Sequence, residues 1–176
     1  MAITRLGGAN AITGTIPTSV APGQGKVLQV VQTVKTDTFT VSTSNTSAPA
    51  DITGFSATIT PTSTSNKILI TAQLSVGGST SHTNFLIDRD GTDIAIADAA
   101  GSRQRLTTIE GIAGGGAGGS ATINFLDTPS STSALTYKIQ ANNNGSTTYI
   151  NRTQVDGDTN SYSRQISTLT LMEIAG

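Results

Sequence analysis

The sequence has no cysteine, no tryptophan and a single histidine, His82. Without cysteine, thiol catalysis, disulfide bonds and cysteine-based zinc sites are excluded. A lone histidine excludes histidine-rich metal sites. Any serine–histidine–aspartate triad would have to use His82, which lies in a polar stretch without a nucleophile-elbow sequence. These residue types predict a protein that is not an enzyme and that carries no cofactor.

Charge is also scarce, since charged residues make up 12% of the chain and the formal net charge is −1, against about 25% charged residues in an average protein. A chain without a basic surface is not expected to bind nucleic acid. No apolar run approaches the roughly 18 residues that span a membrane, so we expect no membrane insertion. The first 25 residues lack the apolar block of a signal peptide, which predicts synthesis in the cytoplasm without a leader.

Small hydroxyl side chains are what the sequence has in abundance, with 31 threonines and 19 serines among 176 residues. A length of 176 residues fits one ordinary domain. Threonine favours strands over helices, and the low lysine and glutamate content removes good helix formers. The composition therefore favours an all-β domain.

The first 25 residues show neither a helical nor a strand period. Their apolar residues stand singly between Gly, Thr, Asn and Pro, and are Ile3, Leu6, Ile12, Ile16 and Val20. Pro17 and Pro22 favour extended backbone. Two interpretations stay open, a flexible leader and an arm that becomes ordered against a partner. The spaced apolar residues favour an extended N-terminal arm over residues 1–25, followed by a body over residues 26–176.

Apolar residues alternate with polar ones from Lys26 onward, as they do in half-buried strands. The clearest case is residues 68–76. Further strands are predicted at residues 27–35, 38–42, 55–59, 84–89, 93–98, 106–112, 121–126, 135–141, 148–151 and 165–175. The dipeptide Asp90-Gly91 predicts a tight hairpin turn. About ten strands with turn residues between them predict an antiparallel β-sandwich or jelly roll.

The last strand is apolar on both faces, with Leu169 and Leu171 on one and Met172 and Ile174 on the other. A strand of this kind is buried on both sides. It is either a central strand or part of an oligomer interface, and the thin core expected from 4% aromatic residues favours the interface. We therefore expect these four residues to contact another copy of the chain.

Asp156, Asp158 and Asn160 place oxygen ligands at the first, third and fifth positions of a calcium-type loop. The later positions do not match, because Ser161 replaces the turn glycine and Ser167 replaces the bidentate glutamate. A polar turn is the favoured interpretation, and these residues remain weak metal candidates.

Several arginine and tyrosine side chains are candidates for contact with a carbohydrate or protein receptor, because Tyr and Arg often anchor interfaces. They are Arg103, Arg105, Tyr149, Arg152 and Tyr162, with Arg164 nearby. The alternative is that they are scattered over the surface.

The opening MAITRLGGANAITGTIPTSVAPGQGKVLQVVQ resembles the N-terminal portion of bacteriophage structural proteins, especially marine and cyanobacterial ones. The segments ITPTSTSNKILITAQLSVGG, INFLDTPSSTSALTYKIQ and ISTLTLMEIA resemble the β-rich body of the same proteins. The resemblance implies a virion protein of the tail-fibre or particle-surface kind, and it transfers no catalytic residue.

The order of the predicted strands also resembles that of trimeric jelly rolls of the tumour-necrosis-factor type, which implies a homotrimer. The resulting expectation is a virion component docked onto other phage proteins by its arm, with host polysaccharide or another receptor as a further partner. A capsid decoration protein on the head shell is the structural alternative. A hydrolase acting on host polysaccharide is the enzymatic one.

Overall fold

The computed structural model describes residues 25–44, 48–78, 82–111, 118–145 and 147–176. Over these residues the chain forms eleven strands and no helix. The strands are β1 Val27–Lys35, β2 Phe39–Val41, β3 Ala50–Ile59, β4 Lys67–Gly78, β5 His82–Arg89, β6 Thr92–Ile94, β7 Thr108–Gly111, β8 Gly118–Asp127, β9 Leu135–Asn143, β10 Thr148–Ile150 and β11 Ser167–Ile174.

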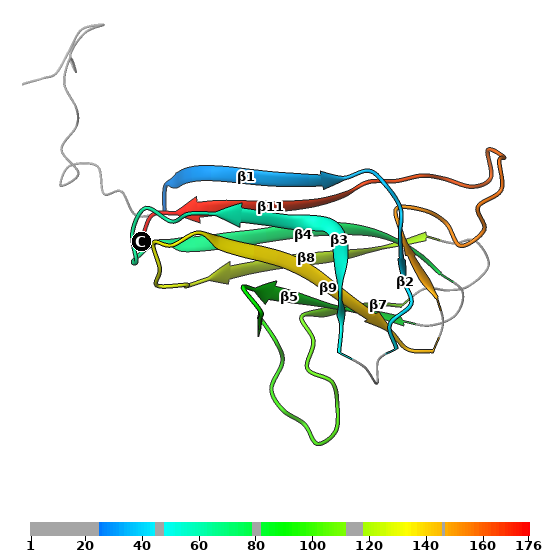
Figure 1. Cartoon of the computed structure of the whole chain (residues 1–176), viewed down its shortest axis with the longest axis horizontal. Helices are drawn as coiled ribbons and strands as arrows, with labels where there is room; N and C mark the ends of the chain where they lie inside the picture. Colours follow the sequence, from blue (N-terminus) through cyan, green and yellow to red (C-terminus); the bar gives the residue numbers. More distant parts are fainter. Residues whose placement is uncertain (1–24, 45–47, 79–81, 112–117, 146) are drawn as a thin grey trace, which may run out of the picture.

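The strands form two sheets in which every strand pairing is antiparallel (Figure 1). The first sheet has the order β1–β11–β4–β8. The short strand β10 pairs with the far end of β4, and β2 pairs with β10. The second sheet has the order β3–β9–β5, and β6 and β7 pair with opposite ends of β5.

Successive long strands alternate between the two sheets. β1, β4, β8 and β11 lie in the first sheet, and β3, β5 and β9, which follow the first three of them along the chain, lie in the second. This alternation of two antiparallel sheets is the topology of a jelly roll. The predicted fold class is thereby confirmed, with eleven strands where about ten were expected.

The core lies between the sheets and is formed by the inward residue of each pleat. β4 supplies Ile68, Ile70, Ala72, Leu74 and Val76, the alternation that the sequence predicted. Opposite them, the second sheet contributes the three fully buried aromatic side chains Phe55, Phe85 and Tyr137. Three of the seven aromatic residues of the chain are thus fully buried in the core.

Most strand boundaries differ from the prediction by up to three residues, and the two larger differences accompany positive backbone φ angles. The strand expected at residues 93–98 ends at Ile94, because Ala95 has a φ of 54°. β3 begins at Ala50 and passes an irregular register around Gly54, whose φ is 75°. The predicted turn is present, since Asp90 and Gly91 both have positive φ, as a type I′ hairpin turn requires.

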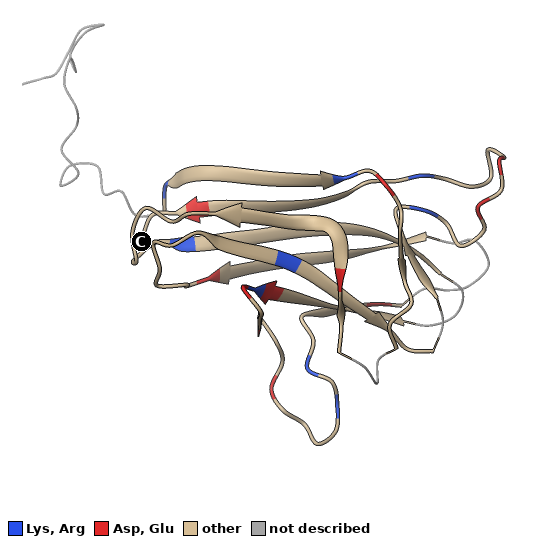
Figure 2. Ribbon diagram, viewed as in Figure 1, with Lys and Arg blue, Asp and Glu red and all other residues tan. Residues whose placement is uncertain are grey.

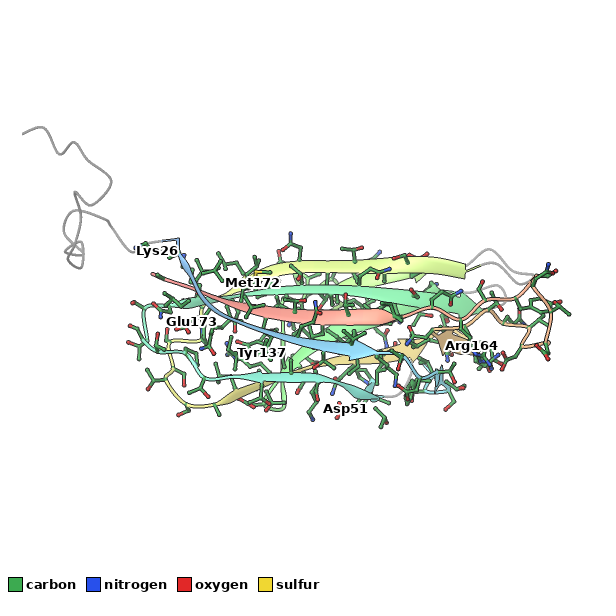
Figure 3. All side chains as sticks on the ribbon, turned by 90° about the horizontal axis from the view of Figure 1, so that it is seen from above. Lys26, Asp51, Tyr137, Arg164, Met172 and Glu173 are labelled. Carbon is green, nitrogen blue, oxygen red and sulfur yellow. The ribbon has the colours of Figure 1, made fainter. Side chains whose placement is uncertain are left out.

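The two ends of the sandwich differ. At one end the chain enters β1, and the Gly25 N–H donates to the carbonyl of Ala175 (2.8 Å), so the entry lies beside the C-terminus. At the other end lies the connection from β10 to β11. In Figure 3, Lys26 and Arg164 are labelled at opposite ends of the molecule.

A buried carboxylate closes the entry end. Glu173 of β11 points inward and is fully buried. It accepts hydrogen bonds from the Thr62 backbone and hydroxyl, from Asn66 and from Gln29. Burial alone would raise the pKa of Glu173, but these hydrogen bonds outweigh it and lower the pKa to about 2. The carboxylate therefore ties β1 and the β3–β4 connection to the last strand.

A buried amide closes the opposite end. Asn151 follows β10 with a φ of 63° and is fully buried. Its Nδ2 donates to the carbonyls of Lys35 and Asp37, and its Oδ1 accepts from the Ser167 hydroxyl. One side chain thus joins the break between β1 and β2 to the start of β11.

Candidate functional site: a sheet face and a distal loop

The outer face of the first sheet is almost free of charge. We define the outer sheet face as the outward side chains of β1, β11, β4 and β8. Four charged residues occur in these strands, and Lys35, Asp127 and Glu173 are buried on the inner side. Only Lys67, at the start of β4, belongs to the outer face. Figure 2 shows the middle of these strands without blue or red.

An apolar row crosses the outer sheet face from edge to edge. The registers place Val30 opposite Met172, Met172 opposite Leu69, and Leu69 opposite Leu126. Directly opposed residues point to the same side of a sheet, so the four side chains form a continuous line across all four strands. Val30 is 56% exposed and Leu126 is 45% exposed. We call these four residues the apolar row.

Polar, uncharged residues cover the centre of the outer sheet face. The next line across the strands is Gln32, Thr170, Thr71 and Asn124, and Gln32 donates to the Thr170 hydroxyl at 2.9 Å. Beside this line lies a shallow hollow of about 170 Å³ between β4 and β8. The outer sheet face therefore combines an apolar row with a line of uncharged polar residues, and it has a hollow between β4 and β8.

The four residues predicted to form an oligomer interface divide between the two sides of β11. Leu169 and Leu171 are fully buried in the core of the same chain, so from this position they cannot contact another copy. Met172 and Ile174 lie half-buried on the outer sheet face, and Figure 3 labels Met172. The pattern that indicated either a central strand or an interface has a simple origin, because β11 lies between β1 and β4.

The second candidate is the distal loop, residues 151–166, which connects β10 to β11. An antiparallel bridge between Arg152 and Arg164 closes its base. Both guanidinium groups lie close to Asp156: Arg164 donates to Oδ1, and Arg152 Nη1 is 3.8 Å from Oδ2. The Arg152 guanidinium also lies over the Tyr149 ring, 3.6 Å from its centroid. Asp156 therefore lies close to two guanidinium groups, and one of them, that of Arg152, also stacks on the ring of Tyr149 in β10.

A hollow of about 350 Å³ lies within the distal loop. It is lined by Asp156, Gly157, Asp158, Thr159, Tyr162, Ser163 and Arg164. The Tyr162 ring packs so closely on Gly157 that a Cβ there would stand 3.1 Å from the ring. The lining is hydroxyl, carboxylate, guanidinium and phenol, which suits a polar ligand or a protein surface rather than a lipid.

The weak metal candidates do not form a cation site in the structure. Arg164 donates a hydrogen bond to Asp156 and thereby lowers the pKa of this carboxyl, with the charge of Arg152 acting in the same direction. Asp158 and Asn160 are exposed. Among the described residues no cluster of three or more His, Asp or Glu could hold a metal ion. Asp156 serves as the partner of two arginines, so the interpretation as a polar turn is the better one.

The predicted receptor residues do not converge as one group. Tyr149, Arg152 and Tyr162 belong to the distal loop or to the strand that leads into it. Arg103 and Arg105 lie in the β6–β7 connection, which packs on the second sheet through a hydrogen bond between Asn84 and Gln104 (2.8 Å). In Figure 1 this connection extends below β5, away from the distal loop. The sequence alone does not show that these residues form two separate groups, because the positions of the connections depend on the topology of the sheets.

The apolar residues of the predicted arm, Ile3, Leu6, Ile12, Ile16 and Val20, lie outside the described residues. Along the part of the chain that the structure covers, no helix is long and apolar enough to cross a membrane.

No family model and no curated protein matches the chain. Among solved structures, it is similar to that of the infectious bursal disease virus Gt strain, with 15% identity and a TM-score of 0.41 over 84% of this chain and 38% of that one. It is also similar to the T13 viral particle of this virus (14%, 0.41, 86% and 36%) and to its VP2 subviral particle (14%, 0.40, 84% and 38%). The chain thus spans less than two fifths of each of these proteins.

Proposed function

We propose that the chain is a non-enzymatic structural protein of a bacteriophage particle, a component of a tail fibre or of its tip. The observation that carries the proposal is the two-ended layout of the domain. Gly25 and Lys26, which lead into β1, lie at the end that holds the C-terminus, and the distal loop lies at the opposite end. Such a domain can be attached at one end and present the other to a surface.

Two further features support a place in a particle. The jelly roll recurs in viral capsid and lectin domains, although a fold alone does not determine function. The sequence resembles phage structural proteins along nearly its whole length. In this proposal residues 1–25 dock onto other virion proteins, three copies of the chain associate, and the distal loop contacts polysaccharide or another receptor on the host.

The choice between a tail fibre and a capsid decoration protein depends on position in the particle. Both functions use the same domain and the same arm. The distal loop favours the fibre, because Asp156, Asp158, Tyr162 and Arg164 line a polar hollow at the end of the domain opposite the entry to β1.

One observation bears on the hydrolase alternative. Asp88 of β5 lies opposite Asp93 of β6, and burial together with the charge of Asp88 raises the pKa of Asp93. Paired carboxylates are the groups that glycosidases use. However, Asp88 Oδ1 accepts the Gly91 N–H (3.1 Å) and so stabilises the hairpin turn. We assign the pair to the turn, and release of reducing sugar from host polysaccharide by the purified protein would contradict this.

The proposal is tested by purifying phage particles through a density gradient and identifying their proteins by mass spectrometry. We expect peptides of this chain in the particle fraction, at a constant ratio to the major capsid protein across the gradient. Peptides found only in the soluble fraction of the lysate would contradict a structural role.

A further inference from the structure

We propose that the outer sheet face is the surface through which copies of this chain associate, with the apolar row as part of the contact. The inference rests on the homotrimer part of the proposed function and adds the surface to it. The partner is a second copy of the same chain, for the three reasons that follow.

The first reason is the distribution of exposed apolar side chains. The described residues contain eight large hydrophobic side chains that are exposed. Five of them belong to the two edge strands of the first sheet: Val27, Leu28, Val30, Val34 and Leu126. Only Ile109 lies on the second sheet, and Val155 and Ile166 lie in the distal loop. Met172 and Leu69 join Val30 to Leu126 in the apolar row, and adjoining exposed apolar side chains, unlike single scattered ones, are typical of an interaction site.

The second reason is charge. Lys67, at one end of β4, is the only charged residue on the outer sheet face. Two copies can therefore approach through this face without opposing like charges across the contact, which would cost several kcal/mol in a charged interface. Apart from Lys67 at one end, the face carries no charge that would attract a strongly basic or acidic partner. Its threonine, glutamine and asparagine side chains can both donate and accept hydrogen bonds, so they can pair with donors or acceptors on a neighbouring copy, which in a trimer come from a different surface.

The third reason is area. Four strands at about 4.8 Å spacing and eight residues at about 3.3 Å rise give a face of roughly 19 by 26 Å, or about 500 Å². Covered by an equal area of a second copy, it buries about 1,000 Å², which is the lower bound of a specific interface. The outer sheet face is therefore large enough for a specific interface, and side chains at its rim would add to the buried area.

The edge strands of the first sheet also support an association through the outer sheet face. β1 and β8 are the edge strands, and edge strands of soluble proteins are commonly protected by outward lysines, prolines or short length. β1 has nine residues, and the outward side chains Val30, Gln32 and Val34 along it carry no charge. A second copy on this face would cover these exposed, uncharged side chains.

The test compares two double variants of the full chain that add equal charge. Val30→Lys/Leu126→Lys places two lysines at the ends of the apolar row. Ile109→Lys/Val155→Lys is the matched control, because these residues are exposed to a similar extent (53% and 44%) but lie away from the outer sheet face. All four positions are on the surface, so both variants should fold, and their circular dichroism spectra and melting curves verify this. The mass of each protein is measured by light scattering.

We expect an oligomeric wild-type chain, an oligomeric control and a monomeric Val30→Lys/Leu126→Lys variant. If both variants stay oligomeric, the association uses another surface and this inference is wrong, while the homotrimer stands. If both become monomeric, the effect is one of added charge and the inference is also wrong. A monomeric wild-type chain would overturn the inference and the homotrimer together. Detection of the chain in particles is independent of all these outcomes.

Discussion

The backbone of Arg152 lies against Gly77, in the position that a side chain on Gly77 would occupy. A Cβ built on Gly77 would stand well inside contact distance of the Arg152 carbonyl oxygen and 3.0 Å from the Cα of Thr153. Gly77 lies in β4 opposite Tyr149, whose ring carries the Arg152 guanidinium. The absence of one side chain in β4 therefore allows the distal loop to cross the sheet at this point.

Gly77→Ala should destabilise the domain, because the new methyl group meets backbone that cannot rotate away. Overpacking of this kind costs about 1–3 kcal/mol, and we expect the upper part of that range in the free energy of unfolding by urea. Gly118→Ala is the control. Gly118 pairs with Gly77 across the sheet, and a Cβ there meets only the Val76 carbonyl at 3.5 Å, an ordinary contact. Equal losses for both variants would contradict this account of the crossing.

Stability should depend on pH below about 4.5 and hardly between pH 5 and 7. The hydrogen bonds to Glu173 lower its pKa to about 2 in the folded chain, from 4.5. A lowered folded-state pKa stabilises the native state above the unfolded value, and this stabilisation is lost as pH falls from about 4.5 towards 2. A shift of this size corresponds to a loss of up to about 3 kcal/mol, which urea unfolding at a series of pH values would measure.

Glu173→Gln isolates this contribution. The amide cannot accept all four hydrogen bonds, and its own N–H group faces donors, so we expect a loss of about 2 kcal/mol at neutral pH. The slope of stability below pH 4.5 should become flatter. A variant that keeps the wild-type slope would assign the pH dependence to other carboxyls with lowered pKa values, of which Asp51, beside Gln140 and Lys138, is one.

Calcium should have no effect on stability. The Asp156 carboxylate accepts a hydrogen bond from Arg164 and lies near Arg152, so a cation would have to displace two guanidinium groups. We expect the same melting temperature in calcium and in a chelator. A melting temperature that rises with calcium concentration and is lost in Asp156→Asn would restore the calcium interpretation of this loop.

Contact with the host should depend on the distal loop and not on the β6–β7 connection. If the Tyr162 ring anchors a receptor, Tyr162→Ala should weaken binding of the purified protein to host cells by about tenfold, as loss of an interface anchor does. Arg103→Ala is the control, since the Arg103 side chain donates a local hydrogen bond to the carbonyl of Ala100 and lies in the β6–β7 connection. The reverse pattern would move the contact to the second sheet.

Strand periodicity carried most of the information about the fold. Val27–Lys35 was predicted with the bounds that β1 has, and the inward residues of β4 were predicted individually. Alternation identifies the two faces of a strand but not which face meets the core. In β1 the valines at 30 and 34 point outward, and Gln29, Val31 and Thr33 point inward. The alternation does not distinguish a β-branched polar residue, such as Thr33, from an apolar residue, so it does not reveal which face of β1 is buried.

The candidate surfaces were only partly predictable, because both are assembled by long-range pairing. Met172 and Ile174 were named from the last strand alone, but Val30, Leu69 and Leu126 join Met172 only through the registers of three strand pairs. No local signal specifies those registers. The bridge between Arg152 and Arg164 could have been suspected from a polar loop flanked by two strands. Its separation from Arg103 and Arg105 could not.

The position of the chain on the particle is the most direct test of the central claim. Purified phage particles are labelled with a gold-conjugated antibody against residues 26–176 and viewed by electron microscopy. The account predicts gold at the tip of the tail. Gold spread over the head would contradict the fibre and support a decoration protein. An antibody against the major capsid protein serves as the positive control. Particles that this control labels but that carry no gold for residues 26–176 would contradict a structural role in the virion.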